Sequence, residues 1–144
     1  MLRIFAVGKM KDRRLDGLLG DFLKRCRPLT RLEVIEVKDS SREKEDRELA
    51  ARLAATPGTG LIVAMDERGQ DLTSEQFAGW LEQEASISFV IGGADGLGPE
   101  IRAASQRQMR LSSMTLTHEM ARVLLAEQIY RGLSILRGLP YHRR

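Results

Sequence analysis

The sequence predicts an α/β fold in which a mostly parallel sheet is covered by helices. Short apolar runs alternate along the chain with segments whose apolar residues recur at helical spacing, a pattern typical of strand–helix–strand units. No internal repeat, low-complexity tract or linker interrupts this alternation. At 144 residues the chain has the size of one domain, and we expect a single domain spanning residues 1–144.

The first strand is predicted at residues 2–7, and an amphipathic helix follows it. Asp12 is the predicted N-cap, and apolar residues recur at spacings of three and four as far as Cys26. We interpret Cys26 as a core thiol because it falls on this apolar stripe. The alternative is a nucleophile, but the sequence offers no evident partner that would lower its pKa.

Two strands and a charged helix are predicted next. The second strand covers residues 32–37, and Ser40 with Glu43 predicts a capping box at the start of a helix that ends before Pro57. The third strand is predicted at residues 61–65.

A glycine-rich loop follows the predicted fourth strand, residues 86–91. Thr73 and Gln76 are expected to cap the helix before that strand, and Pro99 marks the start of a short helix after the loop. The loop itself, GGADGLG, spans residues 92–98. Ligands of open α/β sheets bind outside the carboxyl ends of the strands, so we expect the loop to border a small-molecule pocket. Neither the Rossmann nor the P-loop fingerprint can be read in it.

The C-terminal part is predicted to contain a fifth strand and a long helix. Residues 109–116 form a strand or strand-like segment, and the helix runs from about residue 119 to 137 and stops at Gly138. Apolar residues surround most of this helix, which predicts burial on two sides. We expect the second side to contact another subunit in a homodimer. The alternative is a helix sunk deeply into its own fold.

Composition and charge limit the class of protein. The longest apolar runs are far shorter than a membrane span, and no signal-peptide pattern is present, so we expect a cytoplasmic protein with no membrane contact. One cysteine and two histidines offer no zinc spacing, and we expect no metal, although a carboxylate Mg²⁺ site stays open. The net charge is +3, and cations concentrate in residues 9–31, which suits either a phosphate backbone or a solvated helix face.

Several motifs follow one another along the chain: AVGK at 6–9, VAMD at 63–66, IGGADGL at 91–97, LSSMTLTH at 111–118, RVLLAEQIYR at 122–131 and PYHR at 140–143. In this order they resemble the RlmH family, whose members are SPOUT-class methyltransferases of 23S ribosomal RNA. The resemblance covers the whole chain. Thr117 stands where the family usually has proline, and the region around residues 39–58 looks shorter than in many members.

The resemblance implies a C-terminal trefoil knot, a homodimer, and S-adenosyl-L-methionine (S-adenosylmethionine) bound in the knot. The implied substrate is a pseudouridine in the 23S rRNA of the ribosome or its large subunit, methylated at N3. Gly93 is added to the implied cofactor-binding residues because it adjoins Gly92; the full set is Met65, Gly92, Gly93, Leu111, Ser112, Ser113, Met114, Thr115 and Leu116. Residues 111–116 could equally pack into the core as a strand, and alternate side chains allow both.

The predicted catalytic residues are Tyr141, His142 and Arg143 in the tail, with Arg122 as a further choice. Tyr141 could stack on a base, and His142 and Arg143 lie where the resemblance places RNA and active-site contacts; the alternative is a frayed terminus. Arg122 could stabilise the uracil-like anion or form a surface or interface salt bridge.

Two neighbouring residues have similar alternatives. His118 could cap the last helix or face the pocket, and capping is favoured. Glu127 could assist proton removal or pair with Arg131 four residues later, and the pair is favoured.

Two other function classes stay in view. One is a non-enzymatic RNA-binding protein of the ribosome, which would need no cofactor pocket. The other is a nucleotide-dependent α/β enzyme, which the missing fingerprints disfavour. The sequence alone establishes neither the modified nucleotide, nor whether free rRNA suffices, nor the proton acceptor, nor the effect of Thr117.

Overall fold

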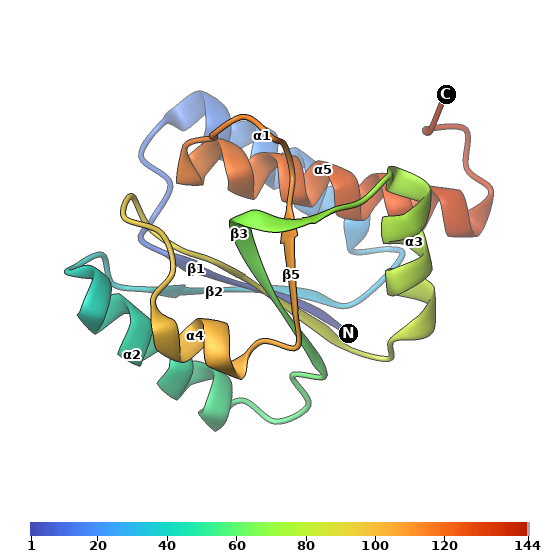
Figure 1. Ribbon diagram of the computed structural model, residues 1–144. Coiled ribbons are helices and arrows are strands. Elements are labelled where there is room, and N and C mark those ends of the chain that lie inside the picture. Colours follow the sequence, from blue (N-terminus) through green and yellow to red (C-terminus); the bar gives the residue numbers. More distant parts are fainter. Residues whose placement is uncertain (144) are drawn as a thin grey trace.

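The computed structural model describes residues 1–143, and the strands in this part of the chain form one parallel sheet (Figure 1). The strand order is β2-β1-β4-β3-β5, so β2 lies on one side of β1 and the other three strands lie on the opposite side. The strands are β1 (Leu2–Val7), β2 (Leu32–Val37), β3 (Leu61–Asp71), β4 (Ile87–Ile91) and β5 (Arg107–Arg110). The predicted α/β class is confirmed.

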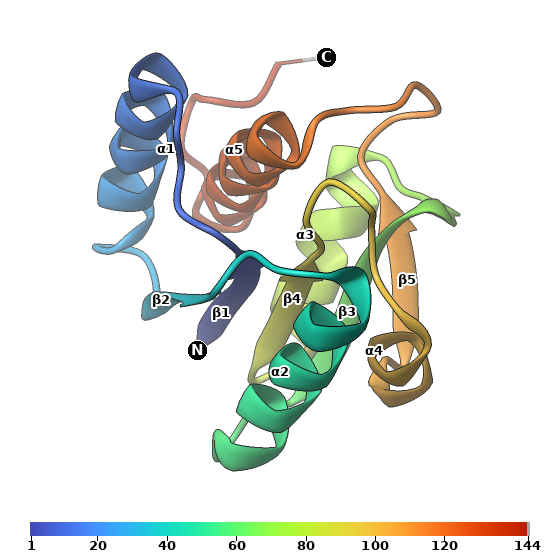
Figure 2. The ribbon, with the colours of Figure 1, turned by 90° about the vertical axis from the view of Figure 1, so that its left-hand side faces the viewer.

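Helices cover both faces of the sheet (Figures 1 and 2). They are α1 (Arg13–Cys26), α2 (Arg42–Ala55), α3 (Ser74–Gln83), α4 (Pro99–Ala104) and α5 (His118–Arg137). One core forms beneath α1, α3 and α5, and a second lies beneath α2 and α4. All residues of β4 are buried, because this strand has neighbours on both sides and helices on both faces.

The helix caps largely follow the predictions. Asp12 accepts hydrogen bonds at the start of α1, and Thr73 forms a full capping box with Gln76. Gly138 ends α5 with a φ of 67°. The predicted cap of α2 is wrong: Ser41, not Ser40, accepts from the Lys44 amide, while the Ser40 amide donates to Glu45 instead.

The predicted strand at 109–116 is wrong in its extent. β5 ends at Arg110, because β3, its one partner strand within residues 1–143, ends at Asp71, which pairs with Arg110. Beyond this point the chain leaves the sheet, and the Ser112 hydroxyl accepts a hydrogen bond of 2.9 Å from the Met114 amide. β3 is longer than predicted because its pairing with β5 resumes at Gln70 after a register shift.

The apolar surface of α5 is largely covered within this chain. The helix packs between α1 and α3 and also contacts β4. This packing supports the alternative of a helix sunk into its own fold, so the homodimer stays a prediction. Near its end, Leu136 and Leu139 remain more than a third exposed. In residues 1–143, no helix is both long and apolar enough to span a membrane.

Candidate functional site

The predicted cofactor residues other than Met65 follow the carboxyl ends of β4 and β5, whereas Met65, expected at the end of its strand, lies within β3 where the pairing with β5 first breaks off. Ala64 pairs with Val90, and Met65 pairs with Met109. Gly92 follows the end of β4, and Leu111 follows the end of β5. Parallel strands present their carboxyl ends together, which is where open α/β sheets bind ligands.

The glycines of the loop at 92–98 are required by the way the loop folds on itself. A Cβ atom on Gly92 would lie 2.6 Å from the backbone carbon of Gly96. The Gly96 amide donates to the Gly93 carbonyl oxygen at 3.0 Å, and Gly96 has a φ of 78°. The glycines therefore close a tight turn at the sheet edge, whether or not a ligand also approaches it.

Two buried carboxylates of α2 support this loop. Asp46 accepts hydrogen bonds from the Glu100 and Ile101 amides at 3.0 and 2.9 Å, so α2 caps the start of α4. Gly98 is needed beside it, because a Cβ there would lie 2.4 Å from the Asp46 carboxyl carbon. This cap could not be predicted from the sequence, because a capping residue 54 positions away leaves no local pattern.

The second carboxylate, Glu45, lies against Gly93. A Cβ on Gly93 would come within 3.0 Å of Oε1 of Glu45. Oε2 accepts a hydrogen bond of 2.8 Å from the Ser40 amide. Burial raises the pKa of the Glu45 carboxyl, and the neighbouring Asp39 and Asp95 carboxylates raise it further.

The segment 111–116 offers an open backbone at the same edge. Within residues 112–116 of the described chain, the recorded hydrogen bond is the turn in which the Met114 amide donates to the Ser112 hydroxyl. Leu111 and Leu116 are half-buried, whereas the Met114 residue is 77% exposed and forms no wall within one chain. Thr117 caps α5 by accepting from the Met120 amide at 3.2 Å, so the favoured capping role of His118 is wrong.

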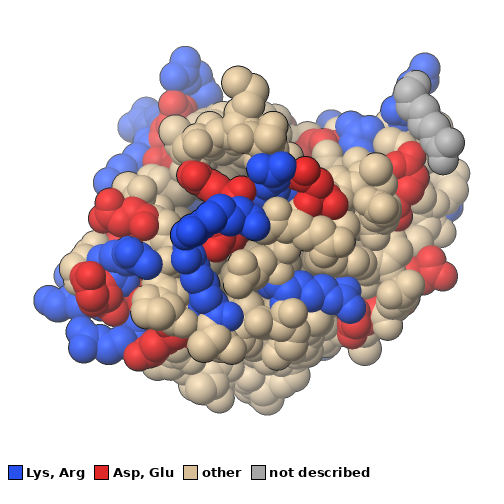
Figure 3. All heavy atoms as spheres, in the orientation of Figure 1, with Lys and Arg blue, Asp and Glu red and all other residues tan. Residues whose placement is uncertain are grey.

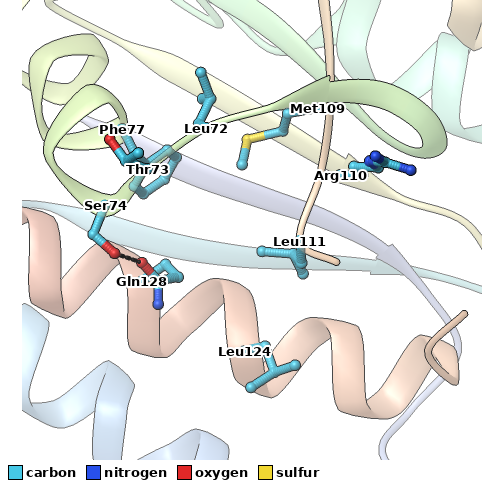
Figure 4. Close-up of a pocket in the computed structure, with 9 residues that line it drawn as sticks. All are labelled: Leu72, Thr73, Ser74, Phe77, Met109, Arg110, Leu111, Leu124 and Gln128. Atoms are coloured by element: carbon cyan, nitrogen blue, oxygen red, sulfur yellow. Dashed lines mark hydrogen bonds between the residues drawn. The ribbon is translucent and has the colours of Figure 1, made fainter. Parts of the chain in front are cut away.

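A cavity of about 320 Å³ lies next to this segment, between the loop after β3, the end of β5, α3 and α5 (Figure 4). Leu111 is the one predicted cofactor residue that lines it. Ser74 donates to Gln128 across it at 2.7 Å. The lining residues are Leu72, Thr73, Ser74, Phe77, Met109, Arg110, Leu111, Leu124 and Gln128. Most of these residues were not predicted. The position of Leu72, Thr73 and Ser74 after the carboxyl end of a strand is the signal that could have indicated them.

The C-terminal tail packs against α5 and α3 rather than fraying. The Tyr141 ring makes an edge contact with Tyr130, with centroids 4.7 Å apart, and its hydroxyl donates to Glu127 at 3.2 Å. Burial and the Glu127 carboxylate raise the pKa of Tyr141. The His142 ring lies between Arg131 and Glu75. Glu127 forms the expected pair with Arg131, at 3.1 Å.

Arg122 is buried and forms an ion pair inside the chain. Its residue is 1% exposed, and Nη1 lies 2.6 Å from Oε2 of Glu36. Nη2 donates to the carbonyl oxygens of Val7 and Gly8, at the end of β1. Of the two roles predicted for Arg122, a salt bridge is present, made within the chain between a buried guanidinium and a partly exposed carboxylate. This position leaves the guanidinium little access to a ligand, and a role in RNA contact stays a prediction.

The cations predicted as an RNA surface lie on and beside α1. All are exposed: Lys9, Lys11, Arg13, Arg14, Lys24, Arg25, Arg27 and Arg31. The Arg25 guanidinium lies 5.8 Å from the centre of the Tyr130 ring on α5, and Tyr130 in turn contacts Tyr141 of the tail. On the face shown in Figure 3, by contrast, basic and acidic side chains are interspersed.

Comparison with known proteins identifies the family. Residues 1–142 match the model of a family described as "Predicted SPOUT methyltransferase". A protein of Paraburkholderia phytofirmans named "Ribosomal RNA large subunit methyltransferase H" is 45% identical over 99% of this chain and 98% of its own length. A protein of the same name from Polynucleobacter asymbioticus is 43% identical over the same shares.

Solved structures agree with this fold. A tRNA methyltransferase from Aquifex aeolicus has a TM-score of 0.61 at 13% identity, covering 97% of this chain and 71% of its own. The SpoU methyltransferase AviRb from Streptomyces viridochromogenes, in complex with the cofactor AdoMet, has a TM-score of 0.51 at 16% identity, covering 96% and 61%. The full-length matches in sequence show that the chain belongs to the RlmH family of SPOUT methyltransferases.

Proposed function

We propose that this protein uses S-adenosylmethionine to methylate N3 of a pseudouridine in 23S rRNA of the ribosome. The observation that carries the proposal is the 45% identity, over nearly the full length of both chains, with a protein named "Ribosomal RNA large subunit methyltransferase H". The pseudouridine and its N3 atom rest on the family resemblance of the motifs at 91–97, 111–118, 122–131 and 140–143. Such an enzyme would act in the cytoplasm, where ribosomes are found.

The sheet edge fits the proposed cofactor. The backbone amides and carbonyls of residues 112–116 are largely free of partners within the described chain, so they could hold the polar edges of an adenosine. Leu111, next to the cavity, and Leu116 offer half-buried apolar surface for its ring. When bound, S-adenosylmethionine would supply an electrophilic methyl group, so the protein needs no nucleophile of its own.

The protein's own groups would bind and orient the RNA. The exposed cations of α1 would hold phosphates, and exposed Arg143 would supply charge near the reacting base. Buried Arg122 would instead hold the end of β1 in place. The imide proton at N3 must leave to a base or to water, so the ring carries negative charge until N3 takes the methyl group; the N3-methylated base and the departing thioether are then both neutral.

A homodimer and a C-terminal trefoil knot form part of the proposal. Exposed apolar residues near both ends of α5, Met114 before its start and Leu136 and Leu139 at its end, are consistent with a partner that covers them. Light scattering of the purified protein would give its mass in solution. A mass near twice the 16.2 kDa of one chain is expected, and a monomer at micromolar concentration would overturn the dimer.

The function is tested by supplying methyl-labelled S-adenosylmethionine to ribosomes that lack the modification, beside free 23S rRNA. Mass spectrometry then locates the labelled nucleotide. Label on N3 of one pseudouridine supports the proposal. Cofactor binding without methyl transfer to either RNA would overturn the proposed substrate. RNA binding without cofactor binding would favour a non-enzymatic RNA-binding protein.

A further inference from the structure

The imidazole of His142 is held from both sides by side chains of two different helices. Nδ1 lies 3.1 Å from Nη1 of Arg131 on α5, and Nε2 lies 3.0 Å from Oε1 of Glu75 on α3. The His142 side chain is only 19% exposed, so solvent competes weakly for these contacts. Arg131 is itself held by Glu127, which also accepts from the Tyr141 hydroxyl.

The chemistry of these partners determines the tautomer of the ring. An arginine guanidinium has donors but no acceptor, so Nδ1 must carry a lone pair and accept from Arg131. A carboxylate accepts, so Nε2 must carry the proton and donate to Glu75. Both contacts are satisfied together only by the neutral Nε2–H imidazole.

This arrangement gives His142 and Arg143 different tasks. Both ring nitrogens of His142 are engaged within the chain, which leaves neither free to take a proton from a substrate. Arg143, the next residue, is exposed. A ring fixed on two helices holds the backbone at residue 142, to which the exposed Arg143 is directly joined.

We propose that Glu75 and Arg131 are positioning residues that hold His142 as the Nε2–H tautomer and thereby present Arg143 to the RNA. We call the two contacts of the His142 ring, with Glu75 and with Arg131, the clamp; it is a property of the free protein. The role of the clamp in RNA methylation rests on the proposed function. The tail is then ordered before RNA arrives, which lowers the entropy lost on binding. Neither Glu75 nor Arg131 was among the residues predicted to act.

The clamp is tested first by ¹⁵N NMR of the imidazole rings in the full-length protein without cofactor or RNA. The chain has two histidines, so the variant His118→Asn assigns the remaining signals to His142. We expect a protonated Nε2 and an unprotonated Nδ1, with the Nε2–H proton protected from exchange. Glu75→Ala should give a mixture of both tautomers, and Glu75→Gln, whose amide oxygen can still accept, should largely restore the wild-type signals.

The matched control is Glu82→Ala. Glu82 is exposed on the same helix and forms no hydrogen bond or ion pair within residues 1–143, so the same loss of charge should leave the His142 signals unchanged. A wild-type ring that already samples both tautomers, or carries its proton on Nδ1, would overturn the clamp whether or not the protein methylates RNA.

Methyl transfer tests the positioning role. Glu75→Ala and Arg131→Ala are expected to lower kcat/KM for the RNA by about 10- to 100-fold, with the Kd for S-adenosylmethionine and the melting temperature little changed. Glu75→Gln should recover most of the loss, and Glu82→Ala should match wild type. If Glu75→Ala frees the ring but keeps full kcat/KM, the positioning role is overturned. Absence of transfer by the wild type contradicts the proposed function and the positioning role, while the NMR result still decides the clamp.

Discussion

Nη1 of Arg122 lies 2.6 Å from Oε2 of Glu36, an ion pair that joins the last helix to an edge strand 86 positions earlier in the chain. The same guanidinium donates to the carbonyl oxygens of Val7 and Gly8, where β1 ends. Its Nε has no partner within the described chain. Arg122 therefore connects α5 with β2 and with the end of β1. Its main effect on the site is to hold these three elements together.

Loss of Arg122 should destabilise the fold. Arg122→Ala leaves two carbonyl oxygens without their donor and opens a cavity, so we expect the free energy of unfolding to fall by about 2–3 kcal/mol. Urea unfolding measures it. Arg110→Ala, which removes an exposed pair with Asp71, is the control and should change stability little. Near-wild-type stability of Arg122→Ala would return this residue to the list of possible RNA contacts.

The close approach at Gly92 predicts a sharp response to alanine. Gly92→Ala would force a methyl group into the Gly96 backbone, which cannot move without opening the loop, so we expect a loss above about 2 kcal/mol and weaker cofactor binding. Gly17→Ala is the opposite case, because its Cβ meets nothing within 4 Å on an exposed turn of α1. It should raise stability by about 0.5–1 kcal/mol. Calorimetry measures the stability of both variants. Equal changes in stability for Gly92→Ala and Gly17→Ala would contradict this account of the loop.

The buried carboxyl of Glu45 predicts a pH-dependent contribution to stability. Its pKa is raised in the folded protein, so its stabilising contribution is complete below its unfolded value and is lost as pH rises through the folded value. Glu45→Gln keeps an acceptor for the Ser40 amide and removes the charge, so the variant should melt at a higher temperature than wild type at pH 7. The difference should shrink near pH 4. A lower melting temperature at pH 7 would show that the charge itself stabilises the protein.

The thiol of Cys26 should be unreactive while the protein is folded. Its side chain is fully buried in the core, as the apolar stripe predicted, and burial raises its pKa to about 11. At pH 8 an alkylating reagent should modify Cys26 only in denaturant. Since the folded pKa is the higher one, the thiol stabilises the fold below its unfolded pKa, and this contribution is lost as pH rises towards 11. Rapid labelling without denaturant would refute this.

The sequence predicted most elements because their signals are local. Asp12, Thr73 with Gln76, and Gly138 lie next to the helix ends that they define, and β1 and β2 have the predicted bounds. The end of β5 could not be predicted in this way, because it depends on where β3 stops.

The candidate site likewise contains residues with a local sequence signal and residues whose contacts are long-range. Met65, Gly92 and Leu111 were placed at one sheet edge through motifs and the strand–helix alternation. The contacts of His142 were out of reach, since Glu75 lies 67 positions away and no pattern joins them. Long-range polar contacts follow from the packed arrangement of helices, which periodicity alone does not define.

The strand order has a consequence for behaviour at high concentration. The outer strands are β2, which carries exposed Glu33 and Glu36, and the short β5, whose first and last residues are Arg107 and Arg110. Charged side chains on short outer strands discourage pairing with strands of another molecule. Self-assembly by extension of the sheet is therefore disfavoured, and any stable contact between copies should form through helices and loops, with the sheet of each chain remaining separate.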